Sequence, residues 1–87
     1  MNGYMRLVKI EWVDSRSTTN KWERLDDLDY MNACQCVSVG FLVKDEADFK
    51  MLVPNLADTD DDSDIQVSAV IVIPTCSITR MVSLAES

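Results

Sequence analysis

Apolar and polar residues alternate along most of this chain, in short segments that polar turns separate. Alternation with a period of two is typical of strands that bury one face. The segments expected to form strands are Tyr4–Val13, Cys36–Lys44, Phe49–Val53, Ile65–Ile73 and Ile78–Leu84. The four residues between the last two segments, Pro74–Ser77, are enough for one 3-10 turn. The pattern therefore predicts a mostly β protein, a small closed barrel of five strands.

Two residues inside these segments refine the prediction. Gly40 stands in the middle of its segment, where glycine weakens a strand, so it indicates a sharp bend, a bulge or the close approach of another backbone. Arg80 would be buried by strict alternation in the last segment, so we expect a bulge there that turns it outward. In the first segment Val8, Ile10 and Trp12 share one face, which we expect to be buried.

The stretch between the first two strands follows a different period. Seven polar residues, 14–20, predict a loop, and Asn20 followed by Glu23 is similar to a helix capping box. Trp22, Leu25 and Leu28 then recur every third residue among charged neighbours. This spacing predicts a short amphipathic helix over Lys21–Tyr30 that lies across one mouth of the barrel.

The length and composition are those of one small domain, residues 1–87. Hydrophobic residues make up 47% of the chain, which is enough for a core. The longest uninterrupted apolar run, Ala69–Ile73, has five residues, far fewer than the ~20 that a membrane helix needs. No secretory signal is visible at the N-terminus, so we expect a soluble cytosolic protein without membrane contact.

Charge is distributed unevenly. The net charge is −7, and residues 45–64 alone hold eight acidic side chains against one lysine, which accounts for the whole excess. Neutralising phosphates requires a basic surface, so direct nucleic-acid binding is not expected. A basic protein surface is a permitted partner.

The acidic loop that ends at Asp64 suggests two kinds of chemistry. Its aspartates partly match a calcium-binding loop, but Ser63 stands where that loop needs glycine and Ala69 where it needs glutamate. Imitation of DNA by carboxylates is the other interpretation, and it is disfavoured because successive turns of a meander point apart. A solvated hairpin loop is the interpretation that we favour for its carboxylates, Asp58, Asp60, Asp61, Asp62 and Asp64.

Cysteine and histidine content bears on catalysis. Cys34 and Cys36 would lie side by side on one face of a strand. They could form a redox or metal pair with Cys76 as a third ligand, or they could be small buried hydrophobic residues. We favour the second interpretation, because free cysteine usually behaves in this way. The chain has no histidine, the commonest general base. We therefore expect no catalytic residue, no metal, no cofactor and no enzymatic activity.

The order of elements resembles the small barrels of the Sm-like and Src-homology-3-like class. More narrowly, the chain resembles a group of short uncharacterised bacteriophage proteins over roughly residues 8–84, at Glu11–Ser15, Trp22, Cys36–Gly40, and Ile73–Pro74 with Ile78. The resemblance implies a phage protein that works in the host cytoplasm, and it transfers no site residue. Sm proteins bind RNA through a loop that corresponds to residues 57–64, which are acidic here and so argue against RNA.

These observations favour a non-enzymatic phage accessory protein that binds a host protein, as an anti-defence or host-takeover factor. Trp12 and Trp22 could both serve a partner, although their spacing favours packing in the barrel and under the helix. The residues that we expect to contact a partner are Trp22, Arg24, Arg16 and Lys21. Alternatives are an oligomer of barrels that sequesters a nucleotide signal, or a minor virion or assembly component. Homo-oligomers are plausible because small barrels can cover their edge strands by association.

Overall fold

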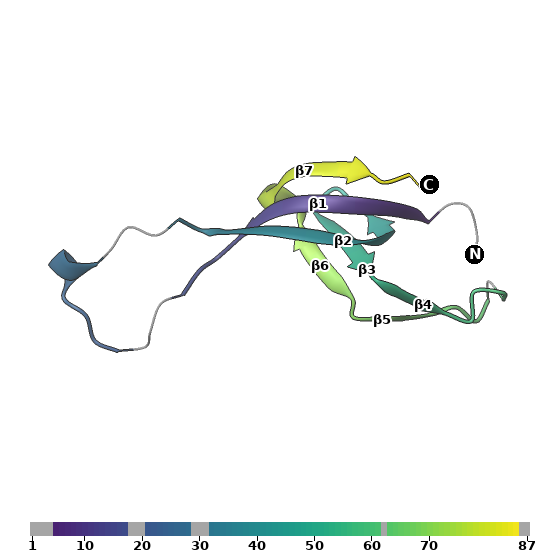
Figure 1. The fold of residues 1–87 in the computed structure, drawn as a ribbon, viewed down its shortest axis with the longest axis horizontal. Coiled ribbons are helices and arrows are strands. Elements are labelled where there is room, and N and C mark those ends of the chain that lie inside the picture. The colour runs from purple at the N-terminus through teal and green to yellow at the C-terminus, as the bar shows by residue number, and fades with distance from the viewer. Residues whose placement is uncertain (1–4, 18–20, 29–31, 62, 86–87) are drawn as a thin grey trace.

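The chain folds into a twisted antiparallel sheet from which one long connection projects (Figure 1). The computed structural model describes residues 5–17, 21–28, 32–61 and 63–85. The molecule measures 58 × 27 × 23 Å. Within the described residues the elements are β1 (Arg6–Asp14), the 3-10 turn η1 (Leu25–Asp27), β2 (Cys34–Asp45), β3 (Phe49–Val53), β4 (Asn55–Ala57), β5 (Gln66–Ser68), β6 (Ile71–Pro74), the 3-10 turn η2 (Thr75–Ser77) and β7 (Ile78–Ser83).

Five strands form the main sheet in the order β6-β3-β2-β1-β7, and β4 pairs with β5 in a separate ladder. The β1–β2 ladder is the longest, running from the pair Arg6 and Leu42 to the pair Asp14 and Cys34. The predicted mostly β class is confirmed. So is the 3-10 turn before the last strand.

The core lies on one face of the main sheet. Its fully or almost fully buried side chains come from four strands: Val8, Ile10, Leu42, Leu52 and Ile73. Trp12 packs against this cluster, as its alternation with Val8 and Ile10 predicted. Its indole Nε1–H donates a hydrogen bond to the Ser38 hydroxyl at 3.0 Å, so the polar end of the ring is satisfied on the same face.

Gly40 allows two backbones to approach each other closely. It is buried, and a Cβ atom on it would lie 2.9 Å from the carbonyl oxygen of Val53 and 3.1 Å from the carbonyl carbon. Of the three roles predicted for this glycine, close approach is the one that these distances support. Nearby, the β2–β3 register shifts between Leu42 and Lys44.

Arg80 is turned outward, as expected. The β1–β7 register shifts between Glu11 and Trp12, which pair with Arg80 and Ile78 respectively. This bulge leaves Arg80 exposed, and its guanidinium lies 3.9 Å from the Glu11 carboxylate. A bulge therefore reconciles a charged residue with an otherwise apolar strand.

The closed barrel predicted from the sequence is wrong, because the main sheet stays open with β6 and β7 at its edges. The expected strand Ile65–Ile73 is divided into β5 and β6 at Ala69, whose φ of 62° is left-handed and breaks the extended backbone. On the neighbouring strand, next to this break, Pro54 separates β3 from β4, a short strand that the sequence did not reveal. At these two interruptions β4 and β5 leave the main sheet and form their own ladder.

The helix predicted over Lys21–Tyr30 is also wrong over its described part. Residues 21–28 contain one 3-10 turn, η1, and its first residue has no side-chain cap. An isolated helix of ten residues is unstable in water and needs an apolar surface to pack against. The connection runs away from the sheet, so that surface is missing (Figure 1). Asn20 and Tyr30, the ends of the predicted capping pattern and helix, lie outside the described residues.

Candidate functional site

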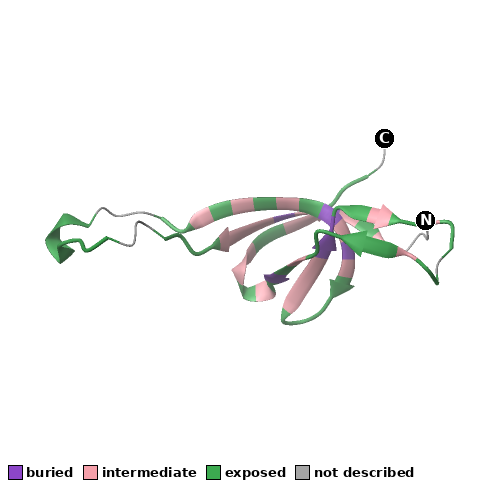
Figure 2. Cartoon of the chain, turned by 90° about the horizontal axis from the view of Figure 1, so that it is seen from below, coloured by how far each residue is buried: buried purple, intermediate pink, exposed green. Residues whose placement is uncertain are grey.

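The most distinctive feature of the molecule is the connection between β1 and β2, which we call the arm and whose described residues are 15–17, 21–28 and 32–33. Every one of these residues is exposed. Figure 2 shows the arm as an exposed projection, whereas the buried residues gather where the strands cross. The arm therefore takes no part in the core of the described protein.

Large apolar side chains on this projection are exposed to solvent. The relative exposure of Trp22 is 103%, that of Leu25 is 82% and that of Leu28 is 50%. The packing interpretation, in which Trp22 fixes a helix to the barrel, is wrong for this reason. Single exposed apolar residues are common on protein surfaces, but here three lie within seven residues, and one of them is tryptophan.

The sequence-predicted contact residues all lie on the arm. Lys21, Trp22 and Arg24 occupy one short stretch before η1, and Arg16 lies on the side that follows β1. Acidic side chains alternate with them, at Glu23 and in the first turn of η1. The backbone of the turn is held by hydrogen bonds from the Asp27 N–H to the Arg24 carbonyl (2.9 Å) and from the Leu28 N–H to the Leu25 carbonyl (3.3 Å). The result is an apolar stretch with charges of both signs beside it.

The acidic loop lies between β4 and β5, and its described aspartates form no group that could hold a metal ion. Asp58, Asp60, Asp61 and Asp64 are exposed, and Asp62 lies outside the described residues. The Asp61 carboxylate accepts hydrogen bonds from the Ser63 hydroxyl (2.7 Å) and backbone N–H (3.1 Å). These bonds, the hydroxyl first, lower the pKa of the Asp61 carboxyl. They form a turn, not a cation cage.

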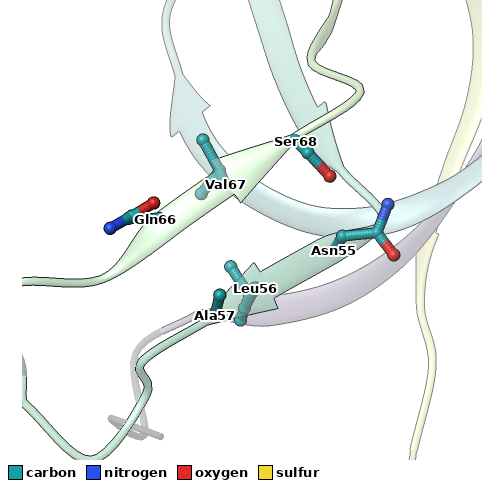
Figure 3. Close-up of a pocket in the computed structure, with 6 residues that line it drawn as sticks. All are labelled: Asn55, Leu56, Ala57, Gln66, Val67 and Ser68. Carbon is teal, nitrogen blue, oxygen red and sulfur yellow. The ribbon is translucent and has the colours of Figure 1, made fainter.

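A shallow depression lies on the β4–β5 ladder and is lined by three residues from each strand (Figure 3). Its volume is about 150 Å³, and its lining residues are Asn55, Leu56, Ala57, Gln66, Val67 and Ser68. Pockets for drug-sized ligands occupy roughly 300–1,000 Å³. No charged side chain is among the lining residues, so this depression is a poor fit for a phosphate-bearing nucleotide.

Two cysteines come together where the arm joins β2. The Sγ atoms of Cys34 and Cys36 lie 3.7 Å apart, and both residues are half-buried. Burial is the main cause that raises the pKa of the Cys36 thiol, and Cys34 adds to the rise through its hydrogen bond and its charge. Cys76 is exposed in η2, and no group of three or more cysteine, aspartate or glutamate side chains in metal-binding geometry exists among the described residues. The alternative that we disfavoured, in which Cys76 completes a metal site with Cys34 and Cys36, therefore has no support in the described residues.

Sequence reasoning assigned Leu25 and Leu28 to the buried side of a helix and so did not count them as surface. It also left open which face of β2 is buried, and the structure exposes Val37 (63%) and Val39 (50%). A period of two identifies two faces without saying which one meets the core. Gly40 was the available signal, because the face on which another backbone approaches closely is the buried one.

No helix in the described ranges is long and apolar enough to cross a membrane. Compared with known proteins, the chain matches no family model, no curated protein and no solved structure significantly.

Proposed function

We propose that this protein is a non-enzymatic binding protein whose arm docks into a partner protein. The observation that carries the proposal is the complete exposure of Trp22 at a projecting position, together with the exposure of Leu25 nearby. Tryptophan and arginine are the residue types most enriched among those that dominate the binding energy of protein interfaces. An exposed tryptophan beside Arg24 therefore offers a partner the chemistry that such interfaces use.

The nature of the partner follows from charge and from the resemblance to phage proteins. A net charge of −7 disfavours nucleic acid, so the partner is a protein. The charges beside Trp22 are of both signs, so the complementary surface needs an apolar pocket with a mixed rim. A bacteriophage origin makes a protein of the bacterial host the expected partner, and an anti-defence or host-takeover role the expected purpose.

Sequestration of a nucleotide signal is the weaker candidate. It needs a pocket with basic side chains, and the depression on the β4–β5 ladder is small and lined without charge. A role in the virion would also involve protein contacts, so it is a different setting for the same arm.

The proposal is tested by capture from a bacterial host lysate with the wild-type chain, a Trp22→Ala/Leu25→Ala variant and a Val72→Ala control. Val72 is 52% exposed on β6, so its truncation removes apolar surface away from the arm. If Trp22 contributes about 2 kcal/mol or more to binding, as dominant interface residues do, the arm variant loses at least about 30-fold in affinity. The control captures the partner as the wild type does.

Quantitative mass spectrometry of the captured proteins reads out the result. Thermal denaturation checks that the variants are folded, and truncation of exposed side chains is expected to change stability by no more than about 0.5 kcal/mol. A partner retained equally by the arm variant would refute the assignment of the arm. If the wild-type chain captures no protein above background, the binding function itself is refuted.

A further inference from the structure

We infer that the first half of β2 is a dimerisation edge, which pairs antiparallel with the same edge of a second copy of this chain. This segment, residues 34–39, is called the β2 edge below. The dimer does not depend on the proposed docking of the arm, because it is formed by the backbone of the sheet.

The β2 edge has a neighbouring strand on one side only. β1 pairs with β2 from Cys34 to Leu42, whereas β3 pairs with β2 only from Phe41 to Asp45. No other described strand lies beside the β2 edge. In an antiparallel ladder, alternate residues direct their N–H and C=O groups away from the partner strand. The β2 edge therefore presents a row of backbone donors and acceptors, which another extended strand can satisfy by adding to the sheet.

The remaining strand edges each carry a feature that discourages such pairing. β7 has Arg80 near its centre and a bulge in its ladder with β1, and β6 is four residues long and ends in Pro74. β4 and β5 have three residues each. Charge, proline, bulges and shortness are the features by which proteins protect strand edges. Residues 34–39 contain neither charge nor proline, and their ladder with β1 has no register shift. Among the described strands, the β2 edge is the one without protection.

The charge of the chain favours a second copy as the occupant of this edge. Two copies with a net charge of −7 repel each other, so they can associate stably only where the contact itself is uncharged. The β2 edge meets this condition. The acidic loop lies away from it, beyond β4 and β5 (Figure 1). Val37 is exposed on this edge and gains contacts when a strand is added beside it.

The sheet allows one register for this dimer. A two-fold axis perpendicular to the sheet keeps the core faces of both copies on one side, and either Cys36 or Val37 can then lie on the axis. With Val37 on the axis, the new ladder would extend to Gly40, where β3 already approaches closely. With Cys36 on the axis, the ladder stays within residues 34–38, and Gln35 lies opposite Val37 of the second copy. Both edges are then used, so association stops at two copies.

The test is sedimentation velocity of the full chain, kept reduced, over a range of concentrations. The Gln35→Lys/Val37→Lys variant places like charges directly opposite each other across the ladder, and both residues are exposed, so the fold should be retained. Val70→Lys/Leu84→Lys is the matched control, because it adds the same charge at two exposed residues outside the strands. We expect the wild type and the control to dimerise alike. The dimer dissociation constant of the edge variant should be at least about tenfold higher.

Hydrogen exchange followed by NMR locates the interface without any variant. Amides of the β2 edge that point away from β1 should exchange more slowly at high protein concentration than at low, whereas exchange at the outer edge of β7 should not depend on concentration. The β2 dimer is refuted if the wild type is still monomeric at about 1 mM, which corresponds to an association free energy weaker than about −4.1 kcal/mol. It is also refuted if polymers larger than dimers form, if the edge variant dimerises as the control does, or if the concentration-dependent protection appears in β7 instead.

Discussion

Replacing Gly40 by alanine is expected to destabilise the protein, although the same change in a strand interior usually stabilises. Alanine restricts the unfolded chain, which by itself contributes about 0.4–1 kcal/mol to stability where the native backbone can accept it. At Gly40 the added methyl group would lie 2.9 Å from the Val53 carbonyl oxygen and 3.4 Å from the Val53 nitrogen. The entropic gain and the steric clash oppose each other, so the sign of the change in stability tests whether the two backbones approach as closely as the structure shows.

The steric term should win because the obstacle is backbone. A side chain could rotate away from the new methyl group, but the carbonyl of Val53 can move only if β3 moves with it. Val53 is completely buried, so such a movement disturbs the packing around it. Overpacking costs about 1–3 kcal/mol, which leaves a net loss of about 1–2 kcal/mol after the entropic gain. In a domain of this size each kcal/mol corresponds to about 4–8 °C in melting temperature.

Thermal denaturation followed by circular dichroism measures this change. The Gly40→Ala variant should melt about 5–15 °C below the wild type. Val39→Ala, next to it on the exposed face of β2, is the control and should cost less than about 1 kcal/mol. A Gly40→Ala variant that melts at or above the wild-type temperature would refute the close approach of β2 and β3.

Two further changes test the core and the acidic loop. Ile10→Ala removes a completely buried side chain and should lower the free energy of unfolding by about 2–5 kcal/mol in urea denaturation, whereas a loss below about 1 kcal/mol would contradict the placement of Ile10 in the core. Ser63→Ala removes the hydroxyl that chiefly lowers the pKa of Asp61, so an NMR titration should find that pKa higher than in the wild type, and an unchanged pKa would rule out the hydrogen bond. Because the pKa of Asp61 is lower in the folded state than in the unfolded chain, ionised Asp61 stabilises the folded state at pH values above its unfolded-state pKa. This stabilisation is lost as the pH falls through the folded-state pKa of Asp61. The Ser63→Ala variant should therefore lose less stability on acidification than the wild type.

Strands could be predicted from the sequence where apolar and polar residues alternate and one face of the strand lies against the core. Phe49–Val53 was predicted with the bounds that β3 has, and the buried face of β1 followed from Val8 and Ile10. The break at Ala69 was not predictable, because alanine carries no signal for a left-handed φ. Closure of the sheet depends on such breaks, so the barrel could not be judged from periodicity alone.

The arm was misjudged for a related reason. The spacing of Trp22, Leu25 and Leu28 indicates that these side chains share one face of a helix. We assumed that this face packs against the sheet of the same molecule. Lys21 and Arg24, which we predicted as contact residues, do lie on this exposed segment. Sequence pattern identifies an apolar stripe, and only the tertiary structure says whether the chain itself covers it.

The length of the arm has an energetic consequence for how the chain folds. Nineteen residues lie between Asp14 and Cys34, the last pair of the β1–β2 ladder. Closing that loop costs about 1 kcal/mol more in chain entropy than closing a five-residue hairpin, since the cost grows with the logarithm of loop length. The exposed described residues of the arm return none of this through burial. A shortened hairpin should therefore give a more stable and faster-folding domain, and a long arm is a feature that folding alone would not maintain.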